Sequence, residues 1–342
     1  MFRGTLPRGF FVRARLIFFC AAGLLGGCSG GGAGEIRLSY SIFFPPSHLQ
    51  TRTALEWASE IQGRTAGRVK ITVYPGETLT KSTRIYDGVV NGVSDLGMSA
   101  FAYTRGRFPV LEGLDLPLGY PDGKTATLAA NTVFDTYRPS ELEDVEVMYL
   151  HAHGPGVLAG KKRLTGLSGL AGMKIRGTGL SGKIVSSLGA VPVSMGQGDT
   201  YEALQRGVVE ATLCPIETLK GWRQAEVIDY VLSTKATGYT TTMYVVMNRD
   251  SWGALPDDIK AVFREVNLLW RQKQGQAWDT ADDEAKELLR TLGKPILSLS
   301  AEEEKKFVDA VNPMLEEWAA SLEGRGLPGN TVLADLRGML KG

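Results

Sequence analysis

Two stretches of this chain, residues 86–100 and 201–215, follow the same order of residue types. Each reads as a helix that ends at a glycine and is followed by a short strand. With one offset of 115 residues (201 − 86), the stretches match at three pairs of positions: Tyr86 with Tyr201, Gly92 with Gly207, and Asp95 with Glu210. The glycine suits the left-handed cap of a helix. Chance similarity is the alternative; a true repeat predicts two lobes of shared architecture that face each other across a cleft.

Strand-like and helix-like segments alternate over most of the chain. Residues 36–43 and 69–75 alternate apolar and polar side chains, as half-buried strands do. Ahead of a terminating glycine, Gly67, three residues occur at helical spacing: Leu55, Ala58 and Ile61. Further strands are expected at three places: 145–153, 191–195 and 241–248. Everything after Pro256 reads as long helices, so the pattern predicts the α/β class with long C-terminal helices.

The N-terminal segment has the features of an export signal. Four arginines precede the apolar run "LIFFCAAGLLGG", and the "LGGC" that ends at Cys28 resembles a bacterial lipobox, in which the chain is cut before a cysteine that carries a diacylglycerol group. We therefore predict a lipoprotein signal peptide at 1–27, lipidation of Cys28, and a flexible glycine-rich tether at 28–35. A plain signal peptide cut nearby or an uncut anchor is the alternative. The protein is expected in the periplasm, anchored to a membrane.

Composition narrows the class of protein further. Of three cysteines, Cys20 leaves with the signal and Cys28 carries lipid, so Cys214 alone remains and no intrachain disulfide is expected. The remaining length of about 315 residues exceeds what one core usually serves, which again favours two lobes. The net charge is +1, with 38 basic and 37 acidic residues and no long basic run, so a nucleic-acid partner is not expected.

Several motifs occur in an order that resembles one family. They are "GLAGMKIRGTG" (169–179), "LGAVPVSM" (188–195), "TYEALQRGVVEA" (200–211) and "YVVMNRDSWGALPDDIKAVF" (244–263). Over nearly the whole mature chain the sequence resembles the solute-binding component of tripartite ATP-independent periplasmic (TRAP) transporters, the DctP family. The resemblance implies a two-lobe fold like that of periplasmic binding proteins. It also implies an organic acid bound in the cleft, delivery to the small and large permease subunits, and neither a catalytic step nor a cofactor.

The resemblance also implies that Arg176, at the end of a short strand, holds the ligand carboxylate. The chemistry agrees, because a guanidinium offers two parallel donors that fit a carboxylate and keeps its charge when it is partly desolvated, whereas lysine lacks this geometry. Gly177 and Gly179 beside it are expected to let the backbone approach the ligand closely. An arginine that caps a helix end or pairs with a surface acid is the alternative.

Two enzyme interpretations compete with solute binding. The stretch "GTGLSG" (177–182) satisfies the glycine pattern of dinucleotide-binding turns, and Asp199 follows about twenty residues later. Against it, the preceding strand carries Lys174 and Arg176, whereas a central parallel strand is nearly all apolar; the motif also lies mid-chain in an exported protein. His151 and His153 share a strand face, but without a carboxylate cluster they favour a core or cleft position over a metal site.

The ligand type is indicated less directly. The segment 151–160, where relatives that bind sialic acid or dicarboxylates tend to carry a second arginine, contains none, and Cys214 stands where an amide side chain is common. Aromatic residues gather at expected strand ends, although each taken singly also suits an ordinary core. We therefore expect a monocarboxylate with an aromatic or otherwise apolar body. The candidate ligand-binding residues are Arg176, Phe43, Phe44, Ser99, Phe101, Tyr103, His153, Cys214 and Glu217.

The chain is expected to cross between the lobes more than once. Lobe I is predicted to comprise residues 36–152 and 241–280, and lobe II residues 153–240 and 281–342. Binding is expected to favour the closed state by hinge motion, and the permease would recognise this closed form. A sensory protein that reports the same ligand to a membrane receptor, without transport, is the alternative from another class.

Overall fold

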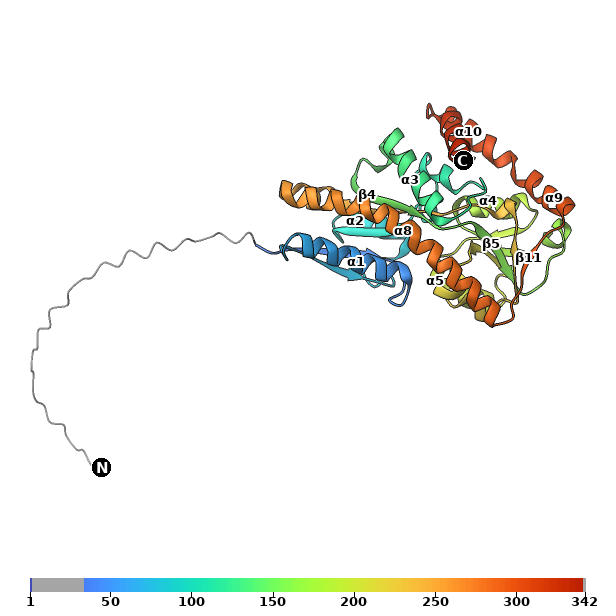
Figure 1. Ribbon diagram of the computed structural model, residues 1–342, viewed down its shortest axis with the longest axis horizontal. Helices are drawn as coiled ribbons and strands as arrows, with labels where there is room; N and C mark the ends of the chain where they lie inside the picture. Colours follow the sequence, from blue (N-terminus) through green and yellow to red (C-terminus); the bar gives the residue numbers. More distant parts are fainter. Residues whose placement is uncertain (2–33, 341–342) are drawn as a thin grey trace, which may run out of the picture. The chain divides into compact units, whose positions relative to one another are not determined.

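The computed structural model describes Met1 and residues 34–340, and the chain from Glu35 onward forms one compact unit. Two separate mixed sheets organise this unit, and helices surround them (Figure 1). The first sheet contains, in spatial order, β2 (Val69–Tyr74), β1 (Ile36–Ile42), β3 (Leu96–Ala100), β10 (Thr242–Asn248) and β4 (Val145–Ala152). The second contains β11 (Ile296–Ser298), β9 (Tyr230–Ser233), β5 (Gly156–Gly160), β8 (Ala211–Pro215), β6 (Lys174–Arg176) and β7 (Val191–Val193). The predicted two-lobe α/β fold is confirmed.

The α-helices occupy the connections between strands and the C-terminal part of the chain. They are α1 (Leu49–Arg64), α2 (Ile85–Val90), α3 (Gly123–Tyr137), α4 (Gly179–Ser187), α5 (Gln197–Gln205), α6 (Thr218–Gly221), α7 (Arg249–Gly253), α8 (Asp257–Thr291), α9 (Ala301–Val311), α10 (Pro313–Glu323) and α11 (Gly329–Met339). Short 3-10 helices include η2 (Phe101–Tyr103) and η3 (Leu111–Asp115). Among the described residues, no helix is both long and apolar enough to cross a membrane.

The repeat predicted from the sequence is present in both sheets. In the first, β1-α1-β2-α2-β3 forms three parallel strands in the order 2-1-3, and in the second β6-α4-β7-α5-β8 forms three in the order 7-6-8. The two matched glycines end α2 and α5 in the left-handed conformation, with φ of 71° at Gly92 and 72° at Gly207. An antiparallel strand then adjoins each third strand, β10 beside β3 and β5 beside β8.

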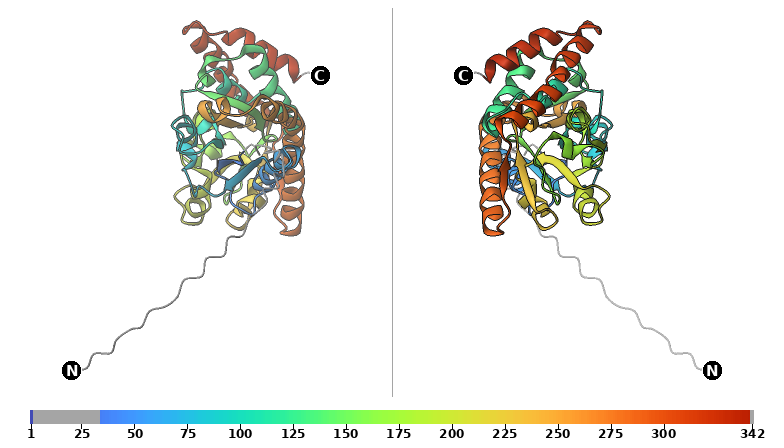
Figure 2. Two further views of the ribbon diagram at one scale, coloured as in Figure 1. Left: turned by 90° about the vertical axis from the view of Figure 1, so that its left-hand side faces the viewer. Right: turned by 90° about the vertical axis from the view of Figure 1, so that its right-hand side faces the viewer.

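The long helix α8 connects the two halves of the unit. It contacts α1, α3 and β4 beside the first sheet and α6 beside the second, and Figure 1 shows it running along both. Its side chains Trp270 and Trp278 pack in the core of the first sheet, whereas Ala285 and Leu289 join an apolar cluster of the second. Figure 2 shows the same helix along one side of the unit in both further views.

Two local predictions need correction. Leu55 is half exposed, because the buried stripe of α1 runs one position earlier, through Ala54, Trp57, Ala58 and Ile61. The segment after Pro256 is helical except for β11, a three-residue strand that pairs with β9 at the edge of the second sheet. Such a short strand carries no alternation of its own, and only its pairing stabilises it.

Helices α10 and α11 lie against the first sheet's core, whereas Phe307 and Val311 of α9 join an apolar cluster of the second sheet. Leu315, Trp318 and Leu322 of α10 are buried there, and the Trp318 indole nitrogen donates a hydrogen bond to the Pro109 carbonyl at 3.1 Å. Leu336 of α11 joins the same cluster. The predicted lobe boundaries stay a prediction, and this packing argues for counting residues 313–339 with lobe I.

Candidate functional site

An inner cavity with a free volume of about 30 Å³ lies where the carboxyl ends of four parallel strands converge. The wall on the side of the first sheet consists of Phe43, Phe44, Ala100, Tyr103, Thr241 and Met243, together with His153 just after β4. The wall on the side of the second sheet consists of Arg176, Thr178, Gln197, Pro215, Glu217, Thr218, Trp222 and Tyr239. Both halves of the repeat thus contribute to one site. The cavity is smaller than typical small-molecule pockets, so a ligand would require the two halves or the lining side chains to move apart.

Arg176, the last residue of β6, lies in this wall with only 4% of its surface exposed. Its Nη2 donates to the Met195 carbonyl at 3.2 Å, and its Nε is buried without a hydrogen-bond partner. Within residues 34–340, no carboxylate lies at salt-bridge distance from this guanidinium. A buried charge without a counter-charge is costly. The site therefore offers an unpaired cationic donor to a ligand.

His153 lies opposite, 1% exposed, with its ring held edge-on against Tyr239 and Trp278 at centroid distances of 5.6 and 6.0 Å. Its Nδ1 is 2.5 Å from the Gly154 carbonyl oxygen. Burial, with Arg176 acting in the same direction, lowers the pKa of His153 to about 4. The imidazole is therefore neutral at neutral pH.

Aromatic rings form the apolar part of the cavity wall. The rings of Phe43 and Trp222 are almost parallel, with centroids 6.1 Å apart, and Tyr103 stands edge-on to Phe43 at 5.6 Å. Tyr103 also joins the two sides of the cavity, since its hydroxyl accepts a hydrogen bond from the Gln197 backbone N–H at 3.2 Å. These rings provide a surface suited to a flat apolar ligand body.

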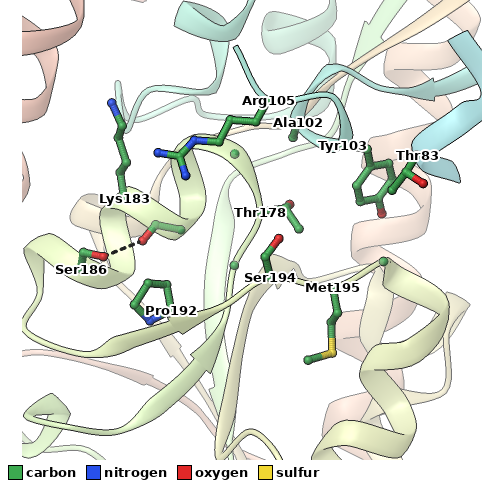
Figure 3. Close-up of a pocket in the computed structure, with 14 residues that line it drawn as sticks. Thr83, Ala102, Tyr103, Arg105, Thr178, Lys183, Ser186, Pro192, Ser194 and Met195 are labelled. Carbon is green, nitrogen blue, oxygen red and sulfur yellow. Dashed lines mark hydrogen bonds between the residues drawn. The ribbon is translucent and has the colours of Figure 1, made fainter. Parts of the chain in front are cut away.

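An outer cavity of about 420 Å³ adjoins the inner one, and Tyr103 and Thr178 line both. Figure 3 shows Arg105 and Lys183 on one side of this outer cavity and Tyr103 with Thr83 on the other. Arg105 belongs to the loop after η2 and Lys183 to α4, so the two cations come from opposite halves of the unit. Tyr103 thus lies between the basic outer cavity and the inner one.

Glu217 contributes a buried carboxylate to the inner cavity. Its Oε2 lies 2.9 Å from His48 Nε2, and its backbone N–H donates to Asp282 Oδ1 at 3.2 Å. Burial and the neighbouring Glu217 raise the pKa of Asp282 to about 8. The end of the cavity next to Glu217 therefore has one carboxylate beside a neutral Asp282, in contrast to the cationic end next to Arg176.

Six of the nine predicted ligand-binding residues line the inner cavity: Arg176, Phe43, Phe44, Tyr103, His153 and Glu217. The other three lie elsewhere. The Ser99 hydroxyl donates to the Ser82 carbonyl, and the Phe101 ring packs in the core against Phe108 and Tyr244. Cys214 is buried in the apolar cluster of the second sheet, where burial raises its pKa to about 11. The predicted lipidation site, Cys28, lies outside the described residues.

Strand alternation explains why Ser99 and Cys214 are displaced from the cavity. Along β8, Pro215 lines the cavity and the preceding Cys214 belongs to the apolar cluster. Along β3, Ala100 lines the cavity while Ser99 contacts the backbone of η1 (Ser82–Arg84). The sequence predicts where the strand ends, but it does not determine which of two consecutive residues at that end lines the cavity.

Nine of the fifteen wall residues were not predicted, among them Gln197, Trp222 and Tyr239. The repeat carries a signal for Gln197, because it begins the helix of the second unit, and helices after parallel strands start near the strand ends. Trp222 lies at the C-cap of α6, a helix of four residues, and Tyr239 lies in a loop. Neither position has a periodicity that marks it as part of a site.

The glycine-rich turn after Arg176 contacts protein atoms. A Cβ added at Gly177 would lie 3.0 Å from the Gly182 backbone, and one added at Gly179 would lie 3.0 Å from the Ala102 side chain. The turn does link a strand to a helix, as dinucleotide-binding turns do. However, the Thr178 N–H already bonds the Ser181 hydroxyl in a capping box, and the two sheets do not form the single doubly wound sheet of that fold.

The two histidines of "HAH" have different surroundings. His151 is in the core, where its Nδ1 accepts a hydrogen bond from the Trp278 indole at 3.0 Å and burial lowers its pKa to about 3. His153 lies at the cavity. Within residues 34–340, no group of three or more His, Cys, Asp or Glu side chains is placed to hold a metal ion.

Comparisons with known proteins show one family and several similar solved structures. The model of the bacterial extracellular solute-binding protein family 7 (DctP) matches residues 40–321. A TRAP periplasmic solute-binding protein from Desulfovibrio salexigens is 30% identical, with a TM-score of 0.79 over 90% of this chain and 96% of that one. A TRAP solute-binding protein from Rhodoferax ferrireducens, in complex with copurified benzoate, is 25% identical, with a TM-score of 0.84 over 90% and 98%.

A third solved structure is also similar. It is a marine metagenome TRAP solute-binding protein specific for aromatic acid ligands, in complex with 3-hydroxybenzoate. It is 27% identical, with a TM-score of 0.85 over 90% of this chain and 98% of that one.

Proposed function

We propose that this chain, which belongs to the bacterial extracellular solute-binding protein family 7 and is a TRAP solute-binding protein, captures an aromatic monocarboxylate in the inner cavity. Arg176 would hold the carboxylate, and the rings of Phe43, Phe44 and Trp222 would enclose the aromatic body. Binding would involve no covalent step and no cofactor.

The observation that carries this proposal is the state of Arg176. Its guanidinium is buried, faces a cavity, and lacks a carboxylate partner among the described residues. An anion in the cavity would remove the cost of this unpaired charge. A carboxylate fits best, because it can take two parallel hydrogen bonds from one guanidinium.

The end of the cavity next to Glu217 supports a ligand with one carboxylate. Glu217 lines the wall, so a second carboxylate placed there would meet a like charge. Aromatic rings cover much of the remaining wall. The similar proteins of known structure that bind benzoate and 3-hydroxybenzoate support the same ligand class.

Delivery of the ligand to small and large TRAP permease subunits is part of the proposal. Contacts between the two halves, such as Tyr103 with Gln197 and His48 with Glu217, close the cavity around its contents. This closed form would be the one that the permease recognises. A sensory role without transport is the competing function. Deletion of the gene should abolish uptake of the labelled acid if transport is correct.

The test of ligand capture is calorimetric titration with benzoate and with benzamide, its neutral amide. Loss of the guanidinium in Arg176→Ala should cost about 2–5 kcal/mol, or roughly thirtyfold to several thousandfold in affinity for benzoate. Arg176→Lys should also bind poorly, because it keeps charge but loses the paired donors. Arg105→Ala, an exposed arginine of the outer cavity, is the matched control and should change the affinity much less.

The amide completes a double-mutant cycle. Replacing benzoate by benzamide should weaken binding strongly in the wild type and little in Arg176→Ala, because both changes remove the same interaction. Additive losses would show that Arg176 does not contact the carboxylate.

Anchoring through Cys28 is the remaining part of the proposal, and it rests on the "LGGC" motif and the glycine-rich segment that follows. Cys28→Ser should release the protein from membranes and leave benzoate affinity unchanged, since Cys28 is far in sequence from every residue of the cavity wall. Fractionation and palmitate labelling measure this. A wild-type protein that takes up no label and fractionates without membranes would contradict anchoring.

A further inference from the structure

Four buried polar atoms around the inner cavity have no hydrogen-bond partner in the described part of the chain. They belong to Arg176 (Nε), Gln197 (Nε2), Trp222 (Nε1) and His153 (Nε2). All four residues line the cavity. Buried polar groups are almost always paired, so such a group of unpaired atoms indicates where a ligand makes its hydrogen bonds.

Three of these atoms can only donate. The Arg176 and Trp222 nitrogens carry hydrogen and have no acceptor lone pair, and the Gln197 amide nitrogen is likewise a donor. A carboxylate only accepts, so it suits these three atoms. Because a carboxylate has no hydrogen to donate, it cannot form a hydrogen bond with an acceptor in the same wall.

The fourth atom, His153 Nε2, is an acceptor. The contact of 2.5 Å between Nδ1 and the Gly154 carbonyl oxygen requires a hydrogen on Nδ1, because a carbonyl oxygen cannot donate. The lowered pKa keeps the ring neutral, so Nε2 has a lone pair and no hydrogen. Packing against Tyr239 and Trp278 fixes the ring in this orientation.

We propose that the ligand is a hydroxy-substituted aromatic monocarboxylate whose hydroxyl donates a hydrogen bond to His153 Nε2. The inference rests on the proposed function, since it adds a second polar contact to a ligand already held by Arg176. A hydroxyl supplies the donor that a carboxylate lacks and stays neutral, as this buried site requires. His153 is thereby the residue that distinguishes hydroxy acids from their unsubstituted parents.

Glu217 is the competing acceptor in the same wall. Its Oε2 already bonds His48 Nε2, whereas His153 Nε2 has no partner among the described residues. A variant of His153 alone therefore separates the two possibilities.

The test compares three hydroxy acids with their O-methyl ethers: 3-hydroxybenzoate, 4-hydroxybenzoate and mandelate. The ether keeps the oxygen but cannot donate, and it leaves a buried acceptor unpaired. The wild type should bind at least one hydroxy acid about 5- to 150-fold more tightly than its ether. His153→Phe, which keeps a flat ring, should reduce this ratio to below about twofold, and His153→Gln, which restores an acceptor, should recover part of it.

A second measurement addresses the tautomer directly and does not depend on a variant. Nitrogen-15 NMR of the histidine side chains in the wild type should show His153 with hydrogen on Nδ1 and none on Nε2, and the Nε2 signal should shift when the hydroxy acid binds. A hydrogen on Nε2 in the free protein would overturn the inference.

The outcomes separate this inference from the proposed function. If benzoate binds through Arg176 but no hydroxy acid is preferred over its ether, or if His153→Phe keeps the preference, the inference is wrong and the proposed function stands. If no aromatic acid binds at all, the proposed function fails and the inference fails with it.

Discussion

His48 Nε2 lies 2.9 Å from Glu217 Oε2, although the two residues are 169 positions apart and lie beside different sheets. His48 is the N-cap of α1, and its Nδ1 accepts a hydrogen bond from the Gln50 backbone N–H at 3.2 Å. Because Nδ1 accepts, Nε2 carries the hydrogen and donates it to Glu217. One side chain therefore both caps a helix and joins the two halves around the cavity.

His48→Asn should separate these two roles. Asparagine is a good N-cap, so α1 should remain folded, but it cannot reach Glu217. The closed state would then contain a buried carboxylate without its partner, which should weaken benzoate binding by about 1–3 kcal/mol, or roughly 5- to 150-fold. Calorimetry measures the affinity, and small-angle scattering with and without benzoate measures closure.

Glu217→Gln is the companion variant. The amide oxygen still accepts from His48 and the buried charge is removed, so closure should survive better than in His48→Asn. If His48→Asn binds benzoate as tightly as the wild type, the contact does not contribute to the closed state.

Gly179 provides a second test of closure, because its Cα approaches Ala102 from the opposite half of the unit. An added Cβ would lie 3.0 Å from the Ala102 side chain, at a φ of 53°. Gly179→Ala should therefore push the halves apart and lower benzoate affinity by about tenfold, in addition to a backbone cost of about 1 kcal/mol. Titration and thermal unfolding measure the two effects.

Gly172→Ala is the matched control for backbone strain. Gly172 has a φ of 74° and no atom within 4 Å of an added Cβ. Gly172→Ala should lose about as much stability as Gly179→Ala and should bind benzoate as tightly as the wild type. Equal affinities in the two variants would mean that the contact with Ala102 has no role in closure.

The sequence predicted the repeat and the position of Arg176, because both depend on local patterns. A glycine after an amphipathic helix marks a left-handed cap, and Gly92 and Gly207 adopt one. Arg176 follows a short strand and precedes a turn, so its place at a strand end followed directly. The predicted strands at 145–153 and 241–248 are likewise present as β4 and β10.

What depends on tertiary contacts could not be predicted in the same way. Whether Cys214 or Pro215 faces the cavity depends on the phase of β8, and Phe101 packs among Phe108 and Tyr244 because η2 turns it into the core. Trp222 lines the cavity from the C-cap of α6, and His48 contacts Glu217 from the N-cap of α1; cap positions leave no periodic signal.

Gly113 tests the docking of helix α10 onto the core of the first sheet. An added Cβ there would overlap the ring of Trp318 in α10. Gly113→Ala should therefore lower the free energy of unfolding by about 1–3 kcal/mol, with benzoate affinity unchanged because neither residue lines the inner cavity. Denaturant titration measures it. Gly338→Ala, at an exposed position of α11 with open space around an added Cβ, should instead stabilise the protein by up to about 1 kcal/mol. Equal stability of Gly113→Ala and the wild type would mean that α10 does not dock as the structure shows.

Asp282 predicts a pH dependence of stability. Burial and Glu217 raise its pKa to about 8 in the folded state, well above the usual 3.8. The folded state therefore holds a proton that the unfolded chain releases between about pH 4 and pH 8. The stabilisation by neutral Asp282 is full below about pH 4 and is lost as the pH rises through about 8. Over this window the free energy of unfolding should fall by on the order of 1 kcal/mol per pH unit on account of this group.

Asp282→Asn should remove the part of the pH dependence of the free energy of unfolding that Asp282 causes. The amide oxygen can still accept the Glu217 N–H, and no charge develops as the pH rises. Burial also raises the pKa of Glu141 to about 7, so the informative quantity is the difference in slope between variant and wild type. Denaturant unfolding of both proteins at several pH values from 4 to 8 measures this difference in slope. Asp283→Asn is the control, because Asp283 is next in sequence but exposed and paired with Lys286, and it should leave the slope unchanged. A slope that is the same in Asp282→Asn and the wild type would mean that Asp282 is ionised in the folded protein, and that the end of the cavity next to Glu217 carries two charges.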